Sequence, residues 1–280
     1  MGARAIMAAP VVGGNAPWRG AVDVAGGLLR LTVAGEGPPL ILLHGWTLDA
    51  RMWQPQMADL ARDFTLIMPD RRGFGRSSAP PDLMREGEDI ARIADVLKLD
   101  RFSLLGLSQG ASVALDTAVM MAGRIDALVV CGAPLPALVE RHETLDLAHY
   151  QALAEAGDLA AMRADWAQHP LMQACNPAAA EALAVMLADY EGHDLARPSA
   201  LPDLTRTDAA SLAMPLLALA GEHDTPWRRA CAAALTAAVP HGSFALVEGA
   251  GHVANLDNPV RFDALVREFL KAAVPQGSLS

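Results

Sequence analysis

Several features that mark particular protein classes are scarce in this 280-residue sequence. Its three cysteines, Cys131, Cys175 and Cys231, lie far apart without a CxxC pair, so we expect neither a disulfide framework nor a zinc site. Cys131 ends an apolar run and is expected to be a small buried hydrophobic residue, not a nucleophile. No uninterrupted apolar run reaches the roughly 18 residues that a membrane span requires. Basic residues form no cluster and the formal net charge is −10, which argues against nucleic-acid and anionic-membrane partners and favours a small-molecule substrate.

The N-terminus also lacks a clear targeting signal. Its weakly apolar stretch is broken by Pro10 and by Gly13 and Gly14, which makes a poor signal-peptide core, so we expect a cytoplasmic protein. Residues 1–20 show too little periodicity to assign and are expected to form a flexible tail. The whole sequence is 52% hydrophobic and 19% charged, which is enough for a large buried core. Length alone leaves open whether that core is one domain with an insertion or two domains.

Short apolar runs alternate with longer helical patterns along most of the chain. Near-continuous apolar runs separated by helix-length spacers are typical of parallel strands covered on both faces, so the sequence predicts an α/β fold with a doubly wound, mostly parallel sheet. The expected parallel strands are 40–43, 64–68, 102–107, 127–131, 216–220 and 244–247, and 28–33 is expected to be an antiparallel leader strand. The expected helices are 50–62, 83–98, 109–122, 226–238 and 259–273.

The alternation stops between residues 135 and 213. This stretch has no strand-like run and contains helical segments at 137–156, 158–168 and 177–190. A helical block between two strands is most simply a cap over one end of the sheet. We therefore expect a core formed by 21–134 and 214–280, with a cap at 135–213.

The strongest chemical motif is Gly106-Leu107-Ser108-Gln109-Gly110, which lies between an expected strand and an expected helix. A nucleophilic serine on a tight strand-to-helix turn needs small residues two positions away on both sides, because the backbone there approaches its neighbours closely. Ser108 is therefore the candidate nucleophile.

A serine hydroxyl requires a base, and the base requires an acid that fixes its tautomer. His252 follows the last expected strand in Gly249-Ala250-Gly251-His252 and is the candidate base. Asp224 follows the strand at 216–220 and is the candidate acid, although Glu222 lies two residues away and is also a carboxylic acid. All three positions lie at carboxyl ends of strands, where open α/β sheets bind ligands.

Acyl transfer also requires donors for the developing oxyanion, usually two backbone N–H groups. By position these are the N–H of Gln109, after the nucleophile, and that of Trp46, in the loop that leaves the strand at 40–43. His44 in the same loop is expected to brace the loop instead of acting as the base.

Together these residues resemble the α/β-hydrolase superfamily over about residues 22–273. The ordered matches are Leu42-Leu43-His44-Gly45-Trp46, Asp70-Arg71-Arg72-Gly73-Phe74-Gly75-Arg76-Ser77, the turn around Ser108, Gly221-Glu222-His223-Asp224 and Gly249-Ala250-Gly251-His252. The resemblance implies the chain order nucleophile, acid, histidine for Ser108, Asp224 and His252, and a structural role for Asp70. Haloalkane dehalogenases and epoxide hydrolases of this fold carry Asp where this chain has Ser108, so acyl chemistry is favoured.

The leading hypothesis is a cofactor-independent and metal-independent serine hydrolase that cleaves carboxylic esters of small, largely apolar substrates. The resemblance, which is greatest to capped bacterial esterases and lactonases, equally allows a lactonase of the enol-lactonase kind or a carbon–carbon bond hydrolase with the same triad. A non-catalytic ligand-binding member of the fold is a more distant alternative.

Overall fold

Eight strands form one sheet in the computed structural model, which describes residues 17–200 and 203–274. Their order across the sheet is β1-β2-β4-β3-β5-β6-β7-β8. The first two pairings, β1 with β2 and β2 with β4, are antiparallel, and every later pairing is parallel. The strands are β1 (Trp18–Val24), β2 (Gly27–Ala34), β3 (Pro39–Leu43), β4 (Thr65–Pro69), β5 (Phe102–Leu107), β6 (Ile125–Cys131), β7 (Leu216–Gly221) and β8 (Gly242–Val247).

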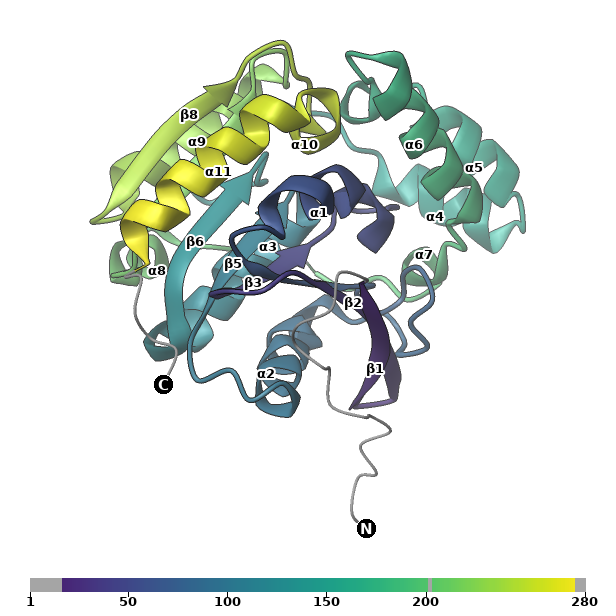
Figure 1. The fold of residues 1–280 in the computed structure, drawn as a ribbon. Helices are drawn as coiled ribbons and strands as arrows, with labels where there is room; N and C mark the ends of the chain where they lie inside the picture. Colours follow the sequence, from purple (N-terminus) through teal and green to yellow (C-terminus); the bar gives the residue numbers. More distant parts are fainter. Residues whose placement is uncertain (1–16, 201–202, 275–280) are drawn as a thin grey trace.

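Helices cover both faces of this sheet (Figure 1). Successive side chains of a strand point to opposite faces, so Leu40 and Leu42 of β3 join one buried cluster, and Ile41 and Leu43 join the other. The first cluster includes α1 (Gln54–Leu60) and α11 (Pro259–Ala273), preceded by the short η1 (Ala50–Trp53) and α10 (Ala254–Asp257). The second includes α2 (Glu86–Val96), which follows η2 (Leu83–Arg85), α3 (Gln109–Met120), which precedes η3 (Ala122–Arg124), and α9 (Pro226–Ala238). The sheet is therefore apolar on both sides.

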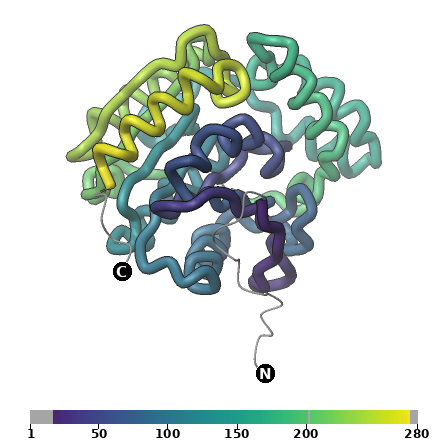
Figure 2. The backbone as a smooth tube through the Cα atoms, in the orientation of Figure 1, coloured from purple at the N-terminus to yellow at the C-terminus, as the bar shows by residue number. Residues whose placement is uncertain are grey.

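A separate group of helices, here called the inserted helices, lies between β6 and β7. In Figure 2 most of this teal and green stretch is gathered apart from the helices that cover the sheet. Its α6 contacts η1 and α10, so the group also rests on the core. The inserted helices are α4 (Leu147–Glu155), α5 (Leu159–Trp166), η4 (Pro170–Met172), α6 (Pro177–Asp189), α7 (His193–Ala196) and α8 (Arg206–Ser211). In the part of the chain that the model describes, no helix is both long and apolar enough to cross a bilayer.

The expected fold class is confirmed, with differences at particular elements. All seven expected strands are present within two residues of their predicted ends, and α11 has the predicted bounds. Strand β1 was not expected; it begins at Trp18, so residues 18–20 are sheet and not tail. The expectation for residues 1–16 lies outside the described range. The helix expected at 137–156 begins only at Leu147, after the N-cap Asp146. The short helices α7 and α8 were also not expected.

Candidate active site

Ser108 lies on a sharply bent turn between β5 and α3. Its backbone has φ 55° and ψ −117°, which a residue with a side chain adopts only under strain. The turn presses α3 against the sheet: a Cβ atom at Gly106 would lie 2.3 Å from the Gly110 carbonyl oxygen, and one at Gly110 would lie 2.2 Å from that of Leu43. Both glycines are therefore required for this turn, as expected from the motif.

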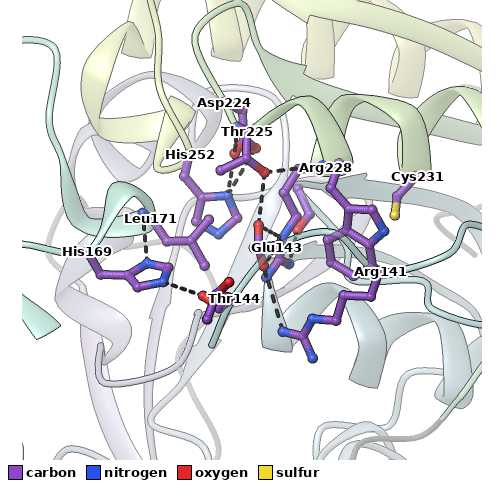
Figure 3. Close-up of polar contacts among 12 residues, drawn as sticks. Arg141, Glu143, Thr144, His169, Leu171, Asp224, Thr225, Arg228, Cys231 and His252 are labelled. Atoms are coloured by element: carbon purple, nitrogen blue, oxygen red, sulfur yellow. Dashed lines mark hydrogen bonds and ion pairs between the residues drawn. The ribbon is translucent and has the colours of Figure 1, made fainter. Parts of the chain in front are cut away.

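His252 and Asp224 meet at the same edge of the sheet, beyond β8 and β7 respectively. Both are buried, and His252 Nδ1 lies 3.0 Å from each carboxylate oxygen of Asp224. Glu222 points elsewhere, because its carboxylate is exposed and accepts a hydrogen bond from the backbone N–H of Gly249. The structure thus pairs the histidine with Asp224 (Figure 3). Glu222 is left in a loop-structuring position.

Gly132 packs directly against this pair and was not anticipated from the sequence. It follows β6 and has φ 59°, and a Cβ atom there would lie 2.8 Å from His252 Cε1 and 3.2 Å from Asp224 Oδ2. A glycine at the carboxyl end of a central strand was the available signal, but only the spatial neighbours show why it matters. Any side chain at this position would displace the imidazole.

Ser108 and His252 line one cavity of about 220 Å³. Within the described structure, no hydrogen bond joins Ser108 Oγ to His252, and the buried His252 Nε2 has no protein partner. The wall is mainly apolar, with charged groups that include Arg141, Arg197 and Arg228. Its apolar members include Trp46, Leu48, Phe74, Leu107, Trp166, Leu171, Met172, Leu195 and Val253. Ser108 and His252 therefore lie against the same mainly apolar cavity.

Trp46 and Gln109, the two candidate oxyanion donors, line the same cavity. In the described residues, neither backbone N–H donates to another protein group, so both are free to bind an oxygen atom. The side chain of Arg71 links their two segments: its guanidinium donates to the Gln109 side chain at 3.0 Å and to the His44 carbonyl at 2.8 Å. Arg71 is itself held by a buried two-point ion pair with Glu86. This network was not predicted from the sequence.

His44 braces the loop from inside. Its Nδ1 lies 2.9 Å from the Gly45 carbonyl and its Nε2 lies 2.9 Å from the backbone nitrogen of Arg71. The Arg71 N–H can only donate, so Nε2 accepts and Nδ1 carries the proton. Burial, together with the charge of Arg71, lowers the pKa of His44 to about 3, so the ring is neutral. His44 is therefore placed to support the loop and not to exchange protons with a substrate.

The inserted helices also contact the loop that carries Trp46. Trp46 Nε1 donates to Asp194 of α7 at 2.6 Å, and the Tyr190 hydroxyl donates to the other oxygen of the same carboxylate at 2.6 Å. Trp166 Nε1 of α5 donates to Thr47 Oγ1 at 2.9 Å. No sequence pattern pointed to these contacts, because the partners are more than 110 residues apart, except for Tyr190 and Asp194.

The surroundings of Cys131 and Asp70 fit structural roles for both residues. Cys131 is completely buried, and burial raises the pKa of its thiol, which disfavours the reactive thiolate. Asp70 accepts hydrogen bonds from the backbone nitrogens of Ala50 and Arg76 and so fixes its turn. In residues 17–200 and 203–274, no three His, Cys, Asp or Glu side chains are grouped so that they could hold a metal ion.

Comparison with known proteins identifies a family. The model of the α/β hydrolase family matches residues 40–265. A curated relative from Enterobacter cloacae, described as the putative carbamate hydrolase RutD, is 28% identical over 249 residues, which cover 82% of this chain and 90% of the relative. The match therefore spans nearly the whole of both proteins.

Solved structures share the same architecture. The carboxylesterase CesB from Bacillus subtilis superposes with a TM-score of 0.77 at 22% identity, over 92% of this chain and 93% of its own. The enol-lactonase from Burkholderia xenovorans superposes with a TM-score of 0.73 at 22% identity, over 90% of this chain and 99% of its own. At these identities, the likeness to both structures concerns the fold alone.

The neutral state of His44 predicts a pH dependence of stability. Between pH 6.5 and about 3 the unfolded imidazole binds a proton that the folded one does not, so acidification over this range favours unfolding. From pH 7.0 to 5.5 this one group should reduce the free energy of unfolding by about 1 kcal/mol. Between these two pH values, we expect the free energy of unfolding of His44→Gln to fall by about 1 kcal/mol less than that of the wild type. Urea unfolding at pH 7.0 and pH 5.5 measures this difference. Titration of the His44 ring between pH 5 and 7 in an NMR experiment would contradict this prediction.

Proposed function

Because the chain belongs to the α/β hydrolase family, we propose that it hydrolyses carboxylic esters of small, largely apolar substrates through an acyl-enzyme. The observation that carries this proposal is the shared cavity: Ser108, His252, Trp46 and Gln109 all line it, and Asp224 holds the far side of the imidazole. These are the groups that acyl transfer through a serine requires.

In the proposed reaction, Ser108 Oγ attacks the ester carbonyl carbon while its proton passes to His252 Nε2. The N–H groups of Trp46 and Gln109 stabilise the resulting oxyanion, and Asp224 stabilises the imidazolium. The bond to the alcohol oxygen then breaks, and the alcohol leaves with the proton from His252. Water attacks the acyl-enzyme with His252 again as the base, which releases the acid and returns the proton to Ser108.

We further propose that the inserted helices act as the cap of this site, with 135–213 as the cap and 21–134 together with 214–280 as the core. Leu171 and Met172 of η4, Trp166 of α5 and Leu195 of α7 supply part of the cavity wall. Side chains from this group would therefore contact the substrate and exclude water from the acyl-enzyme. Substrate choice would be decided mainly by these residues.

Lactone hydrolysis and carbamate hydrolysis are the second candidates. Both use the same nucleophile and oxyanion donors, and the putative carbamate hydrolase RutD is similar to this chain over 82% of its length. Cleavage of a carbon–carbon bond next to a ketone is a further alternative with the same triad. The mainly apolar wall and the small cavity suit a neutral substrate with few polar groups, as a simple ester is.

Ser108→Ala tests the nucleophile. We expect kcat on p-nitrophenyl acetate to fall by roughly 10⁴-fold or more, because the acyl-enzyme cannot form. A fluorophosphonate probe should label the wild type at Ser108 and should not label the variant, as shown by mass spectrometry of the modified peptide. A variant that keeps near-wild-type esterase activity would overturn the proposal, and a wild type that is neither active nor labelled would favour a non-catalytic ligand-binding protein.

A pair of matched variants tests the acid. Asp224→Asn should lower kcat by about 10³- to 10⁴-fold, because the amide no longer holds the imidazole in the required tautomer. Glu222→Gln, which changes a carboxylate only two residues away, should leave kcat within about threefold, since its carboxylate contacts the Gly249 backbone. A larger loss in Glu222→Gln would transfer the role to that residue.

A substrate panel tests the specificity. The cavity of about 220 Å³ lies below the roughly 300–1,000 Å³ of most ligand pockets, so acetyl and butyryl esters should be cleaved faster than dodecanoyl esters. Neutral esters should also exceed half-esters of dicarboxylic acids, lactones and aryl carbamates in kcat/KM. A preference for the anionic half-ester would mean that Arg141 and Arg197 select the substrate, and a preference for lactones or carbamates would reassign the reaction.

A further inference from the structure

A buried carboxylate next to the proposed triad has no part in the mechanism described so far. Glu143 lies in the segment between β6 and α4, and its side chain is only 5% exposed. It forms a two-point ion pair with Arg228 of α9, with Arg228 Nη2 at 2.7 Å from Oε1 and Nε at 3.0 Å from Oε2. It also accepts a hydrogen bond from Thr225 Oγ1 at 2.9 Å. Two groups of the core, the Arg228 guanidinium and the Thr225 hydroxyl, are thus fixed by one side chain (Figure 3).

Both partners of Glu143 continue to the Asp224–His252 pair. The backbone N–H of Thr225 donates to Asp224 Oδ1 at 2.7 Å. Arg228 Nη1 donates to the Gly132 carbonyl at 2.8 Å, and Gly132 is the residue whose Cα side packs against the imidazole. The carboxylate of Asp224 is therefore held from one side and the imidazole is limited from another. Both restraints depend on the position of Glu143.

Glu143 is not placed to contact the substrate. Arg141 and Arg228 line the cavity, whereas Glu143 lies behind them and does not. Arg141 stacks over the Trp227 ring, and its guanidinium is 3.8 Å from Glu143, so one carboxylate faces two cations. Any effect of Glu143 on the reaction must consequently pass through its neighbours.

We propose that Glu143 is a positioning residue of the hydrolytic site: through Thr225 and Arg228 it holds the Asp224–His252 pair in its working geometry and offsets the charge of Arg228. This inference rests on the proposed function. Glu143 belongs to the segment that leads into the inserted helices. The geometry of the Asp224–His252 pair therefore also depends on the position of that segment.

The charges around the imidazole support the proposal that Glu143 offsets the charge of Arg228. The acylation step converts His252 to an imidazolium, which a buried positive charge disfavours and a buried negative charge favours. Three carboxylates lie around the ring: Asp224 from the β7–α9 loop, Glu143 from the segment before α4, and Asp257 of α10, which binds the Gly251 N–H. The other charged or titratable groups there are Arg228 from α9, Arg141 from the segment before α4, and the Cys131 thiol from β6. Without Glu143, Arg228 would oppose the imidazolium with no carboxylate paired to it.

Glu143 keeps its charge in this setting. Burial by itself would raise the pKa of the carboxyl, but the hydrogen bonds and charge of Arg228 and the hydroxyl of Thr225 outweigh burial, so the pKa lies below its ordinary value. The carboxylate is therefore ionised throughout the pH range in which a histidine base operates.

The test compares Glu143→Gln with the wild type on p-nitrophenyl acetate. We expect kcat to fall by about 10- to 100-fold with KM within about threefold, because a slight misplacement of reacting groups is costly while substrate contacts are unchanged. We also expect the acidic limb of the pH profile of kcat/KM to move to lower pH, because the protonated imidazole loses a favourable charge. Glu143→Asp, which retains the charge, should return the limb towards its wild-type position.

Asp63→Asn is the matched control. Asp63 is also a carboxylate bonded to an arginine, Arg267, at 2.8 Å, and its pKa is likewise lowered by its hydrogen bonds to Lys271 and Arg267, but it lies in the turn before β4, away from the cavity. Its kcat and pH profile should match those of the wild type. Thermal melting of every variant shows whether a change in kcat accompanies a loss of folded protein.

Thr225→Val keeps the inference testable if Glu143→Gln does not fold. It removes the hydroxyl that donates to Glu143 and that also accepts from the Arg228 backbone N–H as the N-cap of α9, so thermal melting must show that the variant remains folded. We expect a fall in kcat of about 3- to 10-fold with an unmoved acidic limb, because both charges remain. Wild-type kcat and pH profile in folded Glu143→Gln, or wild-type kcat in Thr225→Val, would overturn the inference. The proposed function would still stand if Ser108→Ala were inactive, whereas an inactive wild type would remove the proposed function itself.

Discussion

The close approach of α3 to the centre of the sheet is the constraint on which the proposed site depends. It forces the strained backbone of Ser108 and places the start of α3 against the carboxyl end of β3. The same contact places Gln109 at the cavity and brings its side chain within reach of Arg71. The stability of the surrounding sheet must offset the strain, which is of order 1–3 kcal/mol for such a residue. The continuous burial of β5 provides that support.

The inserted helices are connected to the proposed site by buried carboxylates as well as by apolar packing. Glu143 binds the loop that carries the candidate acid, and Asp194 binds the Trp46 side chain beside one candidate oxyanion donor. Asp257 joins the backbone nitrogens of Cys175, before α6, and of Gly251, next to the candidate base. Each connection ends on a different loop at the carboxyl edge of the sheet. A shift of the inserted helices would consequently move the loops that carry the proposed reacting groups, in addition to changing the contacts with the substrate.

The features that the sequence could predict are those that depend on residues close together along the chain. The strands appear as apolar runs, and the turn at Ser108 needs glycines only two positions away, so both are visible in a short window. Strand β1 was missed because it is an edge strand: six of its seven residues are half-buried or exposed, so its pattern is weak. Residues 137–146 contain helix-forming types but no helix, because tertiary contacts such as that of Glu143 fix the segment. Glu143 and Arg228 are 85 positions apart, and no local pattern links them.

The energetics of buried ion pairs explain why Glu143 and Arg228 matter more for geometry than for stability. Removing two charges from water costs several kcal/mol per ion, and a well-packed apolar pair of similar volume is often as stable or more so. Two apolar side chains here could fill the space, but they could not donate to the Gly132 carbonyl or accept from Thr225. The directed bonds of a guanidinium and a carboxylate fix positions that packing alone leaves free. Arg71 and Glu86 form a second buried pair of this kind, and it too ends on site residues, at the His44 carbonyl and the Gln109 side chain. In both places, directed bonds of the pair end on residues of the proposed site or of its loops.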